Sequence, residues 1–237
     1  KQVITLAIWP LLEQILSFMV NTVDLILATR MADGDARVAI MDALGLGGYV
    51  MWLMMILQGA VATGVLAIIS RAAGARKPDE AHQGLIQGIL AGLFMGILSG
   101  LIIRLSLPQI IRVFGLSEAA SGYAFDYLSV LAWSCPVLGI FYACTNALRA
   151  VGDTRTPFFI MLFINVCNVT LSAGLVFLDP PLGGLGIAGL AWGSLLAWLL
   201  GTIVVVALLS RKPSPKSDEI TLTLRQASWL PQRQMMA

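Results

Sequence analysis

The sequence predicts an all-α integral membrane protein with six transmembrane helices. It is 58% hydrophobic and 12% charged, whereas soluble domains carry about 25% charged residues. Six apolar stretches reach the roughly 20 residues that a helix needs to cross a bilayer. The first of them also contains a carboxylate, Asp24. Together these observations exclude an ordinary soluble globular protein and favour a membrane protein with a polar site inside it.

Charged and Pro-Gly segments separate the apolar stretches. A charged turn, Arg76–Glu80, follows the second stretch, and a Pro-Pro loop with Gly183 and Gly184 follows the fifth. Leu107-Pro108 predicts a break after the third stretch, with 109–116 lying along the membrane interface. The predicted spans are residues 3–29, 47–69, 83–106, 123–147, 157–178 and 185–209. They form one six-helix lobe, 1–209, followed by a polar tail or inter-lobe linker, 210–237.

Basic residues predict the orientation of these spans. The loops after the second, fourth and sixth spans hold twice as many Lys and Arg residues as the opposite side of the membrane. By the positive-inside rule, both termini are cytoplasmic. We therefore expect a multi-pass protein of the cell (inner) membrane. The eight basic residues are Arg71, Arg76, Lys77, Arg149, Arg155, Arg211, Lys212 and Lys216, against Arg30, Arg37, Arg104 and Arg112.

Charge and motifs narrow the function classes. A net charge of +2 indicates no nucleic-acid partner. The sequence has no GxxxxGK[S/T] phosphate-binding loop of an ATP-driven pump. It also lacks a nucleophile–base pattern and a cluster of metal ligands, so we expect neither an enzyme nor a bound cofactor or metal centre. The partners that remain are the lipid bilayer and small molecules.

The first span carries one acidic stripe. Glu13, Ser17, Asn21 and Asp24 follow one another at i, i+4, i+8 and i+11, which places them within an arc of about 80°. A carboxylate at mid-membrane costs roughly 2.5–3.5 kcal/mol on insertion scales, and such residues usually face a polar interior. The stripe predicts a cation or proton site. If the first span starts late, however, Glu13 lies close to the cytoplasmic surface.

Spans five and six offer further polar groups. Ser172 lies at a depth similar to that of Asp24, and Ser194 lies somewhat deeper. Carboxylate, amide and hydroxyl oxygens are the hard ligands that small cations prefer, so Na⁺ binding at Asp24 is one reading. The alternative is that these amides and hydroxyls only link helices. The candidate cation-coupling residues are Asp24, Asn168, Ser172, Ser194, Asn165 and Glu13.

Substrate-binding residues are not identified by the sequence. Met51, Trp52, Met54 and Met55 in span two form either a soft, adaptable surface for drugs or a lipid-facing or core patch.

Four segments resemble the multidrug and toxic compound extrusion (MATE) transporters of the MOP superfamily. LAIWPLLEQ at 6–14, with Val23-Asp24, resembles the first helix of that family. Gln58-Gly59, Thr63-Gly64 and SRAAGA at 70–75 resemble the second helix and first cytoplasmic loop. ALRAVGDTRTP at 147–157 is similar to the family signature between helices four and five, and GIAGLAWGS at 186–194 resembles the start of helix six. The four occur in the family's order.

The resemblance implies a secondary active transporter, an antiporter coupled to H⁺ or Na⁺ that exports drugs and other organic, often cationic, compounds. Asp24 matches the carboxylate of helix one and Asn168 the Asn of helix five, and Ser194 falls near a Thr of helix six. Ser172 stands where many members carry Asp or Asn. One carboxylate of a two-acid site is then missing, and Glu13 or a backbone carbonyl would have to complete it.

Members of that family have twelve helices in two lobes, and this chain resembles the first lobe. Because it opens on Lys1 and its last segment resembles an inter-lobe linker, we expect a missing C-terminal lobe. The alternative is a half-transporter that pairs with a second copy, which parallel packing of two six-span units permits.

Two competing hypotheses concern the activity itself. One is a lipid-linked oligosaccharide flippase of the same superfamily, which would need a strongly cationic cavity. No basic residue lies well inside a predicted span, and this argues against a flippase. The other hypothesis is an inactive half-transporter remnant or a membrane scaffold, which would fold without binding a cation or a drug.

Overall fold

The computed structural model describes residues 2–180, 183–210, 222 and 224. Five of its helices are long and apolar enough to cross a membrane, and a bent pair, α4 and α5, makes up a sixth span. The all-α, six-span prediction is therefore confirmed, while most of the predicted tail, 210–237, lies outside the described residues. The helices are α1 (Gln2–Ala28), α2 (Gly34–Gly74), α3 (Pro78–Phe114), α4 (Glu118–Leu131), α5 (Ser134–Ala150), α6 (Arg155–Phe177) and α7 (Gly186–Leu209).

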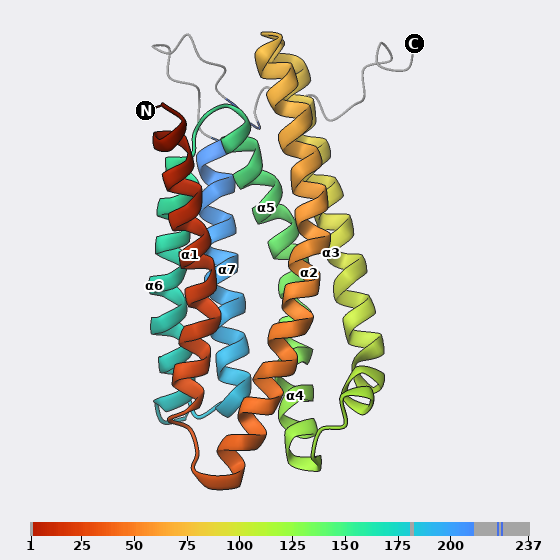
Figure 1. Cartoon of the computed structure of the whole chain (residues 1–237), viewed down its shortest axis with the longest axis vertical. Coiled ribbons are helices and arrows are strands. Elements are labelled where there is room, and N and C mark those ends of the chain that lie inside the picture. The colour runs from red at the N-terminus through yellow and green to blue at the C-terminus, as the bar shows by residue number, and fades with distance from the viewer. Residues whose placement is uncertain (1, 181–182, 211–221, 223, 225–237) are drawn as a thin grey trace.

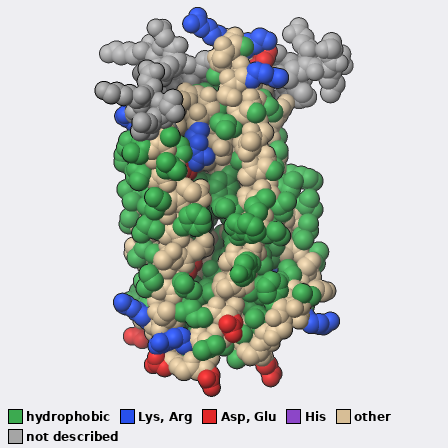
Figure 2. Space-filling model, viewed as in Figure 1, with side chains coloured by type: hydrophobic (Ala, Val, Ile, Leu, Met, Phe, Trp, Pro, Cys, Tyr) green, Lys and Arg blue, Asp and Glu red, His purple; other side chains and the backbone are tan. Residues whose placement is uncertain are grey.

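The helices run along the long axis of the molecule in two groups (Figure 1). In one group α1 packs mainly on α6, and α6 packs mainly on α7; in the other, α2 packs on α3, α4 and α5. The two groups meet where α7 contacts α4 and α5, whereas α1 makes little contact with α2. Figure 2 shows hydrophobic side chains around the middle and charged ones gathered at the two ends, as expected for a bundle in a bilayer.

Helix α3 extends well beyond the predicted span 83–106. The prediction of a break at Leu107-Pro108, with 109–116 as a separate interfacial segment, is wrong, because α3 continues through Pro108 to Phe114. Proline removes one backbone hydrogen bond inside a helix and costs about 3 kcal/mol or more. Leu107 and Ile111, on either side of it, are 0% and 9% exposed within an apolar cluster, and burial of this face keeps the helix intact.

The predicted span 123–147 is divided in the structure. α4 and α5 differ in direction by 46° at a short break after Leu131. Ser134 Oγ donates a hydrogen bond to the Leu131 carbonyl at 2.6 Å. Pro136 falls in the first turn of α5, where its missing N–H removes no helical hydrogen bond. The sequence around 131–136 therefore allows two helices to form one bent crossing.

Glycines bring α3 and α5 into direct backbone contact. A Cβ added at Gly92 would lie 2.3 Å from the Gly139 carbonyl oxygen, and one added at Gly139 would lie 2.0 Å from the Gly92 carbonyl oxygen. Such contacts between small residues are a principal way in which helices associate in membranes, where apolar burial between helices supplies little driving force. This contact fixes the spacing of α3 and α5.

The contact gives a stability prediction. Gly92→Ala should lower the free energy of unfolding by about 1–3 kcal/mol, because the added methyl group has no space against the α5 backbone. Thermal unfolding in detergent measures the effect. Gly64→Ala in α2 is the matched control: nothing lies within 4 Å of its Cβ position, so stability should hold or rise by up to about 1 kcal/mol. Equal unfolding temperatures for the two variants would contradict the contact.

Candidate cation-binding site and adjoining cavities

Asp24 lies one turn before the end of α1 and is 2% exposed. Three side chains from two other helices surround its carboxylate. Ser194 Oγ of α7 donates to Oδ2 at 2.7 Å, while Ser172 Oγ and Asn168 Nδ2 of α6 approach Oδ1 at 3.4 and 3.5 Å. Asn168 and Ser172 are four residues apart and therefore face the same way on α6. The sequence-predicted residues Asp24, Asn168, Ser172 and Ser194 thus meet in one cluster, which we call the Asp24 cluster.

Close packing of α6 on α7 makes this cluster possible. A Cβ at Gly193 would lie 2.3 Å from Ser172 Oγ, so the neighbouring glycine lets Ser194 and Ser172 approach the same carboxylate. Asn168 Nδ2 also donates to Ser194 Oγ at 2.9 Å and to Ser172 Oγ at 3.3 Å. These hydrogen bonds hold the two hydroxyl groups in place around Asp24.

The donor set of the Asp24 cluster fits a proton or a small hard cation. It offers two carboxylate oxygens and two hydroxyl oxygens. It also holds Asn168 Oδ1, which is buried and has no hydrogen-bond partner among the residues that the structure describes. An unpaired buried acceptor is costly, and oxygen ligands of this kind are those that Na⁺-like hard ions prefer. The same carboxylate can instead carry a proton, which would leave the charge of the site neutral.

Asn165 and Glu13 lie outside this cluster. Asn165 Nδ2 donates to the Leu16 carbonyl of α1 at 3.0 Å and to the Met161 carbonyl at 2.9 Å, so it links α1 to α6. Glu13 is 6% exposed and forms a salt bridge with Arg149 of α5. Eleven residues of helix put Glu13 about 16 Å from Asp24 along α1. The structure therefore does not bring Glu13 to Asp24 as a second acid.

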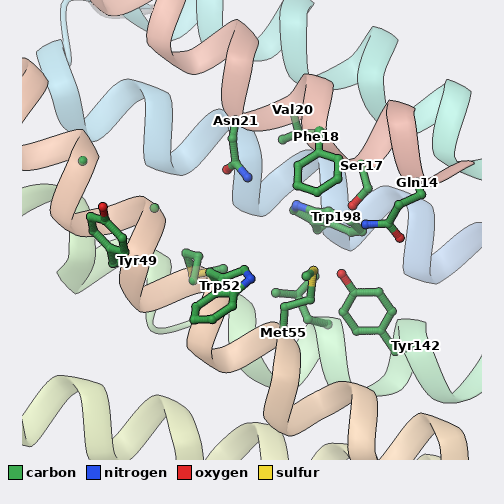
Figure 3. Close-up of a pocket in the computed structure, with 14 residues that line it drawn as sticks. Gln14, Ser17, Phe18, Val20, Asn21, Tyr49, Trp52, Met55, Tyr142 and Trp198 are labelled. Atoms are coloured by element: carbon green, nitrogen blue, oxygen red, sulfur yellow. The ribbon is translucent and has the colours of Figure 1, made fainter.

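A cavity of about 530 Å³ lies between α1 and α2, with α5 and α7 at its back; we call it the central cavity. Figure 3 shows Gln14, Ser17 and Asn21 on one wall, facing Trp52 and Met55 across the space. Its remaining lining residues are Phe18, Val20, Gly45, Gly48, Tyr49, Met51, Leu138, Tyr142 and Trp198. The lining is aromatic and sulfur-rich with neutral polar groups, and its volume is typical of small-molecule sites.

The polar stripe of α1 follows the central cavity from end to end. At one end a cavity of about 210 Å³ contains Asp24 and shares Asn21, Gly45 and Gly48 with it. At the other end a cavity of about 270 Å³ contains Glu13 and Arg149 and shares Gln14, Ser17, Met55, Tyr142 and Trp198. The three cavities therefore follow one another along α1 between the two buried carboxylates, and we call them together the α1–α2 cleft.

Sequence reasoning missed several residues of this cleft. Tyr127 of α4, 4% exposed, lines the Asp24 cavity, and a Cβ at Gly47 would lie 2.6 Å from its ring. Trp198 and Tyr142 form the back of the central cavity. An aromatic side chain at such a position has the same sequence pattern as an ordinary core residue, so hydrophobic periodicity did not identify these three residues as part of the cleft. Of the methionine-rich group in α2, Met51, Trp52 and Met55 line the cavity, while Met54 is buried in the core.

Comparison with known proteins decides the family. The MatE family matches residues 7–173. The chain belongs to the MatE family. MatE proteins are transporters rather than enzymes. The two-group helical bundle described above has the fold of one lobe of the solved MATE transporter structures. The family that the sequence predicted is thereby confirmed.

Individual relatives are distant and longer than this chain. A probable multidrug resistance protein NorM of Rhodopseudomonas palustris is 30% identical over 212 residues, which cover 88% of this chain and 43% of that protein. The uncharacterized transporter YisQ of Bacillus subtilis is 21% identical over 205 residues, 86% of this chain and 44% of its own length. The outward-facing structure of a multidrug resistance MATE transporter superposes with a TM-score of 0.80 at 22% identity, covering 100% of this chain and 49% of the other. The chain thus spans about half the length of the MatE proteins it matches.

The Glu13–Arg149 pair gives a second stability prediction. Glu13→Gln should lower the free energy of unfolding by about 1–3 kcal/mol, because it leaves a largely buried guanidinium without its partner. The double variant Glu13→Gln/Arg149→Gln should recover part of that loss. Chemical unfolding in detergent measures both.

An exposed ion pair of the same protein serves as the control. Lys77 and Glu80 are 60% and 40% exposed at their side chains, and pairs of this kind contribute about 0–1 kcal/mol. Glu80→Gln should therefore change stability little. If Glu13→Gln has no larger effect than Glu80→Gln, the salt bridge between α1 and α5 does not stabilise the protein.

Proposed function

We propose that this MatE lobe belongs to a secondary active transporter that exports small organic compounds in exchange for H⁺ or Na⁺. The observation that carries the proposal is the Asp24 cluster, a buried carboxylate with two hydroxyl donors and an unpartnered amide oxygen. Asp24 lines the 210 Å³ cavity, which shares Asn21, Gly45 and Gly48 with the central cavity. The site for the ion and the space for the substrate therefore share one wall, α1.

Because α1 borders both sites, it explains how binding of the cation or proton would be coupled to binding of the substrate. Binding of a cation or proton neutralises the Asp24 carboxylate and redistributes the hydrogen bonds that hold α1 to α6 and α7. Asn21, one turn before Asp24, lines both cavities, so a shift of α1 changes the substrate space directly. A difference in substrate affinity between the two states of the site is what exchange requires.

The lining of the central cavity suits substrates that bind to aromatic and methionine side chains better than substrates with a strongly charged headgroup. Its fourteen lining residues include no Lys, Arg, Asp or Glu, and Arg149 in the adjoining cavity is neutralised by Glu13. Aromatic faces and methionine side chains adapt to varied organic molecules and attract organic cations. This lining supports drug-like substrates and argues against the lipid-linked oligosaccharide flippase, which would need a cationic cavity.

Orientation and the second lobe are part of the proposal. The N-terminus, the α2–α3 connection and the α5–α6 connection lie at the same end of the bundle (Figure 1). Arg76 and Lys77 lie in the α2–α3 connection, Arg71 lies in the last turn of α2, and Arg155 is the first residue of α6. By the positive-inside rule, we infer that this end of the bundle faces the cytoplasm. The membrane we propose is the cell (inner) membrane. The open seam between α1 and α2 faces a second six-helix lobe.

Asp24→Asn should abolish cation-driven efflux while leaving substrate binding in place, because the amide keeps the shape of the carboxyl group without its charge. Transport of a fluorescent organic cation such as ethidium in proteoliposomes, driven by a pH gradient or by a Na⁺ gradient, measures this and identifies the coupling ion. Asp126→Asn, at an exposed carboxylate of α4, is the control and should transport normally. Unchanged efflux by Asp24→Asn would remove the proposed role.

The transporting particle should contain two lobes. We expect its native mass to be near twice 25.3 kDa or more, since one lobe leaves the α1–α2 cleft open on one side. The two lobes can come from two copies of this chain or from one longer polypeptide. The mass of the denatured polypeptide, isolated from its source membrane, distinguishes these two cases. A mass near 25.3 kDa means two copies of this chain, and a mass near twice that value means one longer polypeptide. Transport by a 25.3-kDa monomer would contradict this proposal.

A further inference from the structure

A small apolar groove lies on the outer surface of the bundle, away from the α1–α2 cleft. It has a volume of about 100 Å³ and lies between α3 and the α4–α5 bend. Its exposed wall is strongly hydrophobic, with Ile97, Leu101 and Trp133 at 45%, 52% and 65% exposure. In a membrane this surface faces lipid. We call it the Arg104 groove, because its remaining lining residues are Gly100, Ala132, Pro136 and Arg104.

The shape of the groove follows from two features of the fold. At its closed end α3 and the α4–α5 bend touch, since a Cβ at Gly100 would lie 2.6 Å from the Ala132 carbonyl oxygen. From that point α4 turns away from the direction of α5 by 46°. In Figure 1 the lower part of α3 lies to the right of α4. A hollow bounded by a glycine, a proline and an exposed indole suits a flexible hydrocarbon chain.

Arg104 places one positive charge at the groove. It is exposed, and its guanidinium carbon lies 5.3 Å from the centre of the Phe125 ring. Among the residues that the structure describes, no carboxylate forms a salt bridge with it; the three such pairs involve Arg37, Lys77 and Arg149. A guanidinium carries five N–H donors in a fork that matches phosphate geometry. Stacking on Phe125 orients it while those donors stay available.

The height of Arg104 along the bundle matches a lipid headgroup. It lies ten residues before the end of α3, about 15 Å from that end. Asp126, an exposed carboxylate, lies at a similar height, eight residues or about 12 Å into α4. Leu101 and Ile97 precede Arg104 on α3 by three and seven residues, so they lie farther from the end of that helix. Trp133 lies fifteen residues beyond the start of α4, farther from this end than Asp126. Arginine side chains near the ends of membrane helices reach toward the boundary between headgroups and hydrocarbon.

We propose that the Arg104 groove is a binding site for an anionic glycerophospholipid of the leaflet opposite the N-terminus. The phosphate accepts hydrogen bonds from the Arg104 guanidinium, and one acyl chain lies in the hollow beside Gly100, Ala132 and Pro136. The bound lipid fills the wedge between α3 and α4 and holds the bend at Ala132. The site is distinct from the Asp24 cluster, and nothing in it depends on the proposed transport activity.

Native mass spectrometry of the delipidated full chain, titrated with palmitoyl-oleoyl phosphatidylglycerol, tests the proposal. The first lipid should bind to Arg104→Gln about tenfold more weakly than to the unmodified chain, because a hydrogen bond between charged groups is lost. Arg112→Gln is the matched control, since Arg112 is another exposed arginine of α3 that does not line the groove. Arg112→Gln should bind the first lipid as tightly as the unmodified chain does.

Further measurements separate the contribution of the acyl chain to lipid binding from that of the phosphate charge. Trp133→Ala should lower the affinity for phosphatidylglycerol. Trp192→Ala, at an exposed indole of α7 outside the groove, should leave this affinity unchanged. Inorganic phosphate at millimolar concentration should fail to displace the lipid, and diacylglycerol, which lacks the phosphate, should bind weakly.

A photoreactive group in the acyl chain of phosphatidylglycerol should label the peptides that contain Leu101 and Trp133. Equal lipid affinity in Arg104→Gln and Arg112→Gln would overturn the proposal. So would labelling spread over all helices, or displacement of the lipid by inorganic phosphate.

Discussion

Burial of the Asp24 carboxylate is the constraint on which the arrangement of α1, α6 and α7 depends. An ionised group in an apolar bundle is tolerated only when other polar groups replace the water it has lost. Here Ser194, Ser172 and Asn168 do so from two helices at once. Those side chains reach the carboxylate only because Gly193 lets α6 and α7 approach closely. Charge, helix spacing and the position of α1 are therefore one interdependent feature.

The second helix group is held by a different kind of interaction. Gly92 of α3 and Gly139 of α5 bring two backbones together. Gln58 of α2 adds a weak hydrogen bond to the Cys135 carbonyl at 3.3 Å. These contacts involve no titratable group. The bundle thus combines a group whose contacts change with the charge of one residue and a group whose contacts do not.

The cleft lies along the boundary between the two groups, where α1 and α2 touch least. Relative movement of the groups would alter its width without disturbing either the hydrogen bonds of the Asp24 cluster or the glycine contacts of α3 and α5. The Glu13–Arg149 pair crosses this boundary near the end that holds the N-terminus. The groups are therefore tied at that end, whereas the Asp24 end of the cleft lacks a salt bridge among the residues that the structure describes.

Hydropathy and helical period predict the features that depend on single helices. The six crossings and the acidic stripe of α1 follow from local pattern, because a helix places residues at i, i+4 and i+8 on one face whatever surrounds it. Comparison of depths predicted that Asp24 and Ser172 lie at one level, and the resemblance to the MATE family added Asn168 and Ser194 to the predicted site.

Features that need a partner helix were not predictable in this way. Pro108 reads locally as a helix end, and only the burial of Leu107 and Ile111 keeps the helix continuous. The partner of Glu13 lies 136 residues away, beyond any local pattern. Tyr127 and Trp198 likewise belong to the cleft only because α4 and α7 place them there.

The Gly92–Gly139 contact also restricts how this sequence can diverge. In most cores, a larger residue at one position can be accommodated by a smaller one opposite, so pairs of positions drift together over time. Here each residue already has the smallest side chain available, and each faces the main chain of the other. No change at one position can make room for a change at its partner. The pair should therefore persist in descendants of this protein long after the surrounding apolar residues have been exchanged.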